Sequence, residues 1–142
     1  PRIAIKAHGD IDLFFEDLDR KLSLCVDQLM ERYKIQASKK AKNYPFLMGQ
    51  GIWLDSDKLK PNDSVAEVLK HGTLTVGFIG LAETLKALIG AHHGESREAQ
   101  SLGLEIIGYM RKRMDEATAR TGFNYSLIAT PAEGRVRPPL CG

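Results

Sequence analysis

The 142-residue chain is long enough for one domain, and its 43% hydrophobic and 27% charged residues are typical of a protein with a packed core. Its formal net charge of +2 is too small to indicate a nucleic acid or a membrane surface as a partner, so neither is predicted. No apolar run approaches the ~20 residues that cross a bilayer, and no secretory signal is present, so we expect a cytoplasmic protein. Cys25 and Cys141 form no CxxC pair, which predicts neither a disulfide framework nor a zinc site.

The first predicted elements are a strand end and a long helix. Ile3 and Ile5 alternate within residues 1–7, which indicates the end of a strand. Because the sequence begins with proline rather than methionine, we expect it to be cut from a longer chain.

Asp10 is a predicted N-cap for a helix that runs at least to Tyr33. Carried on to Lys42 this helix would be about 50 Å long, so a break near Lys34 or Ser38 is expected. We expect Cys25, which lies on its apolar stripe, to be a buried small hydrophobe. The predicted inward positions include Phe14, Leu18, Leu22 and Leu29.

Residues 43–63 contain prolines and glycines that prevent one regular helix. The segment is also rich in apolar residues, so we expect it to pack against the core or against a partner surface. Ser64 and Glu67 have the spacing of a capping box and predict a short helix to about Lys70, which Gly72 ends.

A strand is predicted at residues 73–79, followed by a turn at Gly80 and a helix with Leu81, Leu85 and Leu88 on one face. A strand, a glycine and a helix in this order direct backbone N–H groups beyond the end of the strand. The alternative is that Gly77 and Gly80 only permit close packing against a neighbouring element.

The connector at residues 90–95 carries His92 and His93. Adjacent histidines do not point at one metal ion from a helix face, so no metal site is predicted and we expect loop or capping roles. Ser96 is a predicted N-cap for the next helix, which Gly122 ends. Its expected buried stripe is Ala99, Leu102, Gly103, Ile106, Met110, Met114 and Ala117.

A second strand is predicted at residues 124–129. A crossover connection makes it parallel to the strand at 73–79, so Gly80 and Thr130 should lie on the same rim. Thr130 and Pro131 are predicted to be the N-cap and the first position of a helix, with Glu133 in its first turn. Such a helix start favours binding of an anion. The alternative is that Thr130 is a cap with nothing bound.

Several long strings, spanning nearly the whole chain except its last eight residues, resemble the catalytic subunit of anaerobic, class III ribonucleoside-triphosphate reductases. They are Tyr44-Pro45-Phe46-Leu47-Met48-Gly49-Gln50-Gly51-Ile52-Trp53-Leu54, residues 71–83, His92-His93-Gly94-Glu95-Ser96, Leu102-Gly103-Leu104-Glu105-Ile106 and residues 126–134. The resemblance implies an α/β fold, as part of a ten-stranded glycyl-radical-enzyme barrel over residues 1–134, with a divergent tail at 135–142. It also implies reduction of ribonucleoside triphosphates at the 2′ position through a transient cysteine radical.

The resemblance further implies a substrate-phosphate loop of Thr130, Pro131, Ala132, Glu133 and Gly134. Gly80 and Glu83 belong to the other rim motif, with either an active-site or a structural role for Glu83. No catalytic residue is assigned within the chain, because the radical cysteine is expected just before Pro1 and the glycyl-radical loop beyond Gly142.

The family's structural zinc site is likewise expected beyond Gly142, and many members use formate as reductant, so no cofactor is assigned to this chain. The expected partners are a ribonucleoside triphosphate, a radical-generating activase and a second copy of the chain. With neither radical carrier, the isolated chain should be inactive. The alternative is a non-catalytic module that binds a nucleotide or a protein.

Overall fold

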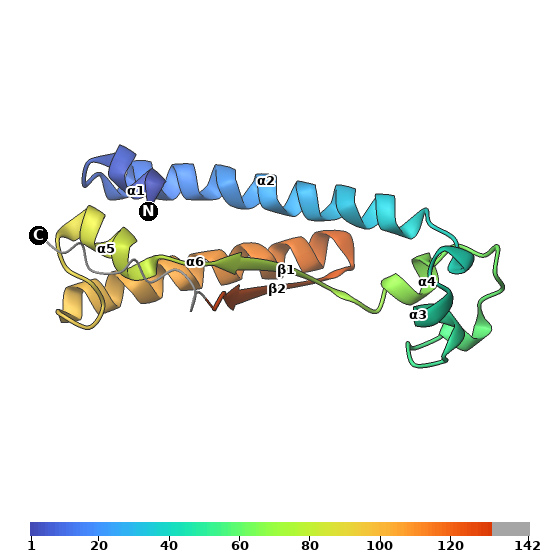
Figure 1. Cartoon of the computed structure of the whole chain (residues 1–142). Coiled ribbons are helices and arrows are strands. Elements are labelled where there is room, and N and C mark those ends of the chain that lie inside the picture. Colours follow the sequence, from blue (N-terminus) through green and yellow to red (C-terminus); the bar gives the residue numbers. More distant parts are fainter. Residues whose placement is uncertain (132–142) are drawn as a thin grey trace, which may run out of the picture. The chain divides into compact units, whose positions relative to one another are not determined.

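The computed structural model of the chain describes residues 1–131 and is mostly helical, with one two-stranded parallel sheet (Figure 1). No helix among these residues is both long and apolar enough to cross a membrane. The elements in order are α1 Arg2–Ala7, α2 Ile11–Ala37, the 3₁₀ turn η1 Ala41–Asn43, α3 Pro45–Gly49, the 3₁₀ turn η2 Ser56–Lys58, α4 Ala66–Leu69, β1 Thr73–Phe78, α5 Leu81–Ile89, α6 Arg97–Thr121 and β2 Asn124–Ala129.

The described chain divides into two units, and their boundaries fall inside α2, β1, α6 and β2. Unit 1 comprises Pro1–Asp19, Thr75–Lys112 and the described part of Leu127–Gly142, and unit 2 comprises Arg20–Leu74 and Arg113–Ser126. Unit 1 buries Ala4, Ala7, Phe14, Leu18, Val76, Leu85, Leu88, Ala99, Ile106 and Met110. Unit 2 buries Leu22, Val26, Ala41, Met48, Val65, Val68, Met114, Ala117 and Tyr125.

The long helix α2 begins and ends where the sequence predicted. The Asp10 carboxylate accepts a hydrogen bond from the N–H of Leu13 at 3.0 Å, which is the predicted N-cap. The helix ends at Ala37, next to the expected break at Ser38. Phe14, Leu18 and Leu22 are buried as predicted. Leu29 and Cys25 are only half-buried, so the prediction of a buried Cys25 is wrong.

The prediction of a strand within residues 1–7 is also wrong, because this segment forms α1. The buried positions are Ala4 and Ala7, three residues apart on one helix face, while Ile5 is 60% exposed. The N–H of Ile5 donates to the carbonyl of Pro1 at 2.9 Å, a helical bond. Two alternating isoleucines are too short a pattern to distinguish a strand from one helical turn.

Residues 39–71 of unit 2 form a small cluster at the end of α2. An isolated antiparallel bridge joins Lys40 to Ser64, and Tyr44, Leu59 and Leu69 pack on the buried residues Ala41, Met48, Val65 and Val68. The segment 43–63 therefore holds two short helical pieces and contributes Met48 to a core. Five further large apolar residues of the segment are exposed, namely Phe46, Leu47, Ile52, Trp53 and Leu54.

The predicted capping box at Ser64 takes a different form. The Ser64 hydroxyl accepts from the N–H of Ala66 at 3.1 Å and also donates to the carbonyl of Ala37, at the end of α2. Glu67 pairs with Lys70 instead of reaching back to the helix start. The Ser64 side chain thus serves a tertiary contact that the local pattern does not reveal.

Within this cluster, Asp55 joins the start of η2 to His71, two residues before β1. Its carboxylate pairs with Lys58, and its second oxygen lies 2.8 Å from Nε2 of His71. Lys58 first, and His71 second, hold the pKa of Asp55 below its ordinary value. A carboxylate with a lowered folded-state pKa stabilises the fold above its unfolded-state pKa of about 4, and this stability is lost as the pH falls through the lower, folded-state value.

We therefore expect Asp55→Asn to lower the free energy of unfolding at neutral pH and to leave it nearly unchanged in strong acid, where the wild-type carboxylate is also neutral. Urea unfolding at about pH 7 and at a series of pH values down to about 2 measures this difference. Asp57→Asn, in the same turn, is the matched control and should retain the wild-type pH dependence. An equal loss for Asp55→Asn across this pH series would contradict the ion-pair explanation.

Candidate functional site

The rim at the carboxyl ends of the two strands lies within unit 1 and is closed by Thr130. The N–H of Thr130 donates to the carbonyl of Phe78 at 2.9 Å, so the residue after β2 is held beside the last residue of β1. A Cβ added at Gly77 would lie only 2.2 Å from Oγ1 of Thr130 and 3.7 Å from Cγ2 of Ile128. Gly77 therefore leaves the space that the Thr130 side chain occupies.

Gly80 makes the turn between β1 and α5. Its φ of +81° lies in the left-handed region that favours glycine. Its carbonyl accepts from the N–H and the hydroxyl of Thr84, at 3.0 and 2.8 Å. A Cβ at this position would lie 2.9 Å from Cγ of Pro1, so α1 approaches the turn closely.

Glu83 lies in the first turn of α5, exposed, with Oε2 3.5 Å from the place that a Gly80 side chain would take. Its carboxylate is at the positive end of the helix dipole, which by itself accounts for an acidic residue there. Glu83 is therefore close enough to the turn to border a ligand held at the rim.

Of the predicted site residues, Glu83 lies next to Gly80, and Thr130 is held beside Phe78 and Gly77, two and three residues before Gly80; Pro131 follows Thr130 in the chain. The predicted parallel pairing of the strands is confirmed. Close packing at Gly77 and Gly80 is present, as the alternative interpretation required. Ala132, Glu133 and Gly134 lie outside the described residues. The close approach of Pro1 to Gly80 is not predicted from the sequence, because no local pattern indicates it.

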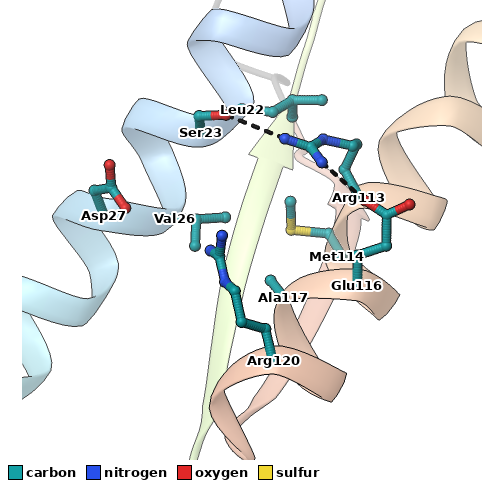
Figure 2. Close-up of a pocket in the computed structure, with 9 residues that line it drawn as sticks. All are labelled: Leu22, Ser23, Val26, Asp27, Arg113, Met114, Glu116, Ala117 and Arg120. Atoms are coloured by element: carbon teal, nitrogen blue, oxygen red, sulfur yellow. Dashed lines mark hydrogen bonds and ion pairs between the residues drawn. The ribbon is translucent and has the colours of Figure 1, made fainter.

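A hollow of about 270 Å³ lies in unit 2 between α2 and α6 (Figure 2). Arg113 donates to Ser23 at 3.2 Å and to Glu116 at 2.8 Å, and Arg120 and Asp27 also line the hollow. Two arginines and two carboxylates line the hollow, so their charges offset one another. This balance of charge disfavours binding of a nucleoside triphosphate in the hollow.

Residues 1–131 hold no group of three histidine, cysteine or acidic side chains arranged to bind a metal ion. Of the two cysteines, the structure describes Cys25, which is half-buried on α2 in unit 2. These residues do not fit a zinc or radical centre, so no chemical step is assigned to such a group here.

Comparison with known proteins gives one consistent result. The sequence model of the family described as anaerobic ribonucleoside-triphosphate reductase matches residues 1–137. The chain is 35% identical over 136 residues to the protein of that name from Salmonella typhimurium and 34% identical over 136 residues to that from Escherichia coli. It is 32% identical over 139 residues to that of Enterobacteria phage T4. Each match covers 94% of this chain, and the chain spans only about a fifth of the length of these relatives, 19% of the bacterial proteins and 21% of the phage protein.

Proposed function

Because the chain belongs to the anaerobic ribonucleoside-triphosphate reductase family, we propose that it supplies part of the α/β barrel of such an enzyme, including one side of the substrate site. The reaction would be the reduction of ribonucleoside triphosphates to deoxyribonucleoside triphosphates by glycyl and thiyl radical chemistry. Two parallel strands connected through α5 and α6 are compatible with two neighbouring strands of a barrel. Residues 1–134 would form the barrel part.

The observation that carries the proposal is the bond from Thr130 N–H to the Phe78 carbonyl. It holds the start of the Thr130–Gly134 loop beside the strand–glycine–helix turn at Gly80. A ligand with several phosphates would accept hydrogen bonds from the N–H groups of Ala132, Glu133 and Gly134, since Pro131 has none. Glu83 would border the same site, and the Glu133 side chain would turn away from the phosphates because like charges repel.

Ala132→Pro tests the phosphate loop, because it deletes one N–H donor while the turn stays possible. Loss of a charge-assisted hydrogen bond of about 1.5–3 kcal/mol predicts roughly ten- to hundred-fold weaker binding of a ribonucleoside triphosphate. Isothermal titration calorimetry of the full-length protein measures it. Ala132→Ser retains the N–H group and is the matched control, and unchanged affinity in a folded Ala132→Pro protein would rule the loop out.

The radical carriers, formate, a structural zinc ion and a radical-generating activase enter this proposal only through family membership. Reductase activity is therefore expected of a protein that also supplies the radical cysteine and the glycyl radical, and not of these 142 residues alone. Such a chain could still bind a nucleotide or a protein as a non-catalytic module.

Self-association is proposed on a separate observation. Phe46, Ile52 and Leu54 are 70%, 73% and 66% exposed within unit 2, and each of the two strands has one neighbour in the described sheet. Exposed apolar side chains and open strand edges favour pairing with another chain. Sedimentation velocity over a range of concentrations measures this, and a strictly monomeric species at high concentration would exclude it.

A further inference from the structure

Hydrogen bonds between His92 and Glu95 close a short loop in the connector between α5 and α6. The Glu95 carboxylate accepts from the backbone N–H of His92 at 3.0 Å, and the N–H of Glu95 donates to the His92 carbonyl at 2.9 Å. Nζ of Lys86, on α5, lies 3.3 Å from the same carboxylate. The backbone bond from His92 first, and Lys86 after it, hold the pKa of Glu95 below its ordinary value, so Glu95 is a carboxylate at neutral pH.

The neighbours of the two nitrogens of the His92 ring show which nitrogen carries the proton. Nδ1 lies 3.0 Å from the N–H of Gly94, and Nε2 lies 3.1 Å from Oε1 of Glu95. A backbone N–H only donates, so Nδ1 has to be the unprotonated acceptor. The hydrogen of the neutral ring is therefore on Nε2, the nitrogen nearest the Glu95 carboxylate. The geometry requires the neutral ring with its proton on Nε2.

Gly94 is part of the same arrangement. A Cβ at this position would lie 3.1 Å from Cε1 and 3.3 Å from Nδ1 of His92, tighter than ordinary contact. The absence of a side chain therefore lets the Gly94 N–H approach the ring. The resulting closed loop is built from residues 92–95 and the Lys86 side chain.

We propose that the His92 ring holds the α5–α6 connector closed through its hydrogen bond to Gly94, and that acid opens this contact. This acid-sensitive catch is separate from the proposed substrate site. A second proton can be added only at Nδ1. It would occupy the lone pair that now accepts the hydrogen bond from the Gly94 N–H. The Gly94 hydrogen bond is then lost and the ring has to move, while Glu95 continues to attract it. The charged or titratable groups around the ring are Glu95, the Lys86 side chain that pairs with Glu95, and His93. The ring of His93 stands edge-on to that of His92, with 5.7 Å between centroids.

Nuclear magnetic resonance of the full chain tests the proposal directly. At about pH 8 the histidine ¹⁵N shifts of His92 should show the tautomer protonated on Nε2. On acidification the Gly94 amide resonance should move in step with protonation of His92, and its hydrogen-exchange protection factor should fall about 2- to 10-fold, as expected for one lost hydrogen bond.

His92→Asn separates the catch from the general effects of acid. The asparagine side-chain oxygen can accept from the Gly94 N–H as an Asx turn at any pH, so the acid-dependent change at Gly94 should disappear. His93→Asn is the matched control and should retain that change. The proposal is overturned if His92 carries its proton on Nδ1 or is already charged at pH 8. It is equally overturned if the Gly94 amide does not follow His92 in the wild-type chain, a result that needs no variant to fold.

Discussion

Leu85→Ala is expected to lower the free energy of unfolding by about 2–5 kcal/mol, the range for truncating a fully buried leucine. Leu85 is 0% exposed in unit 1, on the inward face of α5. Its Cδ1 would lie 3.3 Å from a Cβ at Gly103 of α6, so the two helices approach closely at this pair. A cavity at a close helix contact cannot collapse easily, which places the expected cost toward the upper part of the range.

Urea unfolding followed by circular dichroism measures this loss as a lower midpoint at constant slope. Leu104→Ala is the matched control, because it makes the same substitution at a leucine that is 66% exposed, and it should change the free energy by less than about 0.5 kcal/mol. Equal effects of the two substitutions would contradict the assignment of Leu85 to the core.

The sequence predicted the elements whose signals are local and long. Asp10 and Ser96 cap α2 and α6, with side-chain bonds at 3.0 and 3.1 Å, and β2 has the predicted bounds. The apolar stripe of α6 is buried at Ala99, Ile106, Met110, Met114 and Ala117. These elements repeat one period over many residues, so the pattern outweighs the uncertainty at any single position.

What the sequence did not predict depends on contacts between distant residues. Arg2–Ala7 forms the helix α1, which buries Ala4 and Ala7 in unit 1, and two alternating isoleucines do not indicate this burial. Ser64 bonds to the end of α2, 27 residues earlier in the chain.

The rim was predicted from the parallel strands, but not its detailed form. Gly77 was seen as a place of close packing, whereas its partner Thr130 lies more than 50 residues away and is known only from the structure. The remaining loop residues, 132–134, rest on the family resemblance alone.

Gly80→Ala is expected to destabilise the protein by about 2–5 kcal/mol, because two separate costs add at this turn. An L-residue in the left-handed region costs about 1–2 kcal/mol, and Gly80 has a φ of +81°. The new Cβ would also lie 2.9 Å from Cγ and 3.1 Å from Cδ of Pro1. Relieving this contact costs about 1–3 kcal/mol, as overpacking typically does, because the proline ring cannot rotate away.

Gly90→Ala isolates the first cost, since Gly90 ends α5 with a φ of +79° and a Cβ there would meet nothing within 4 Å. It should therefore lose only about 1–2 kcal/mol. The difference between the two variants in urea unfolding measures the steric contribution of Pro1, and the double variant Pro1→Gly with Gly80→Ala should recover most of that difference. Equal losses at Gly80 and Gly90 would show that α1 does not press on the turn at the rim, and Gly80 would then be required for its backbone conformation alone.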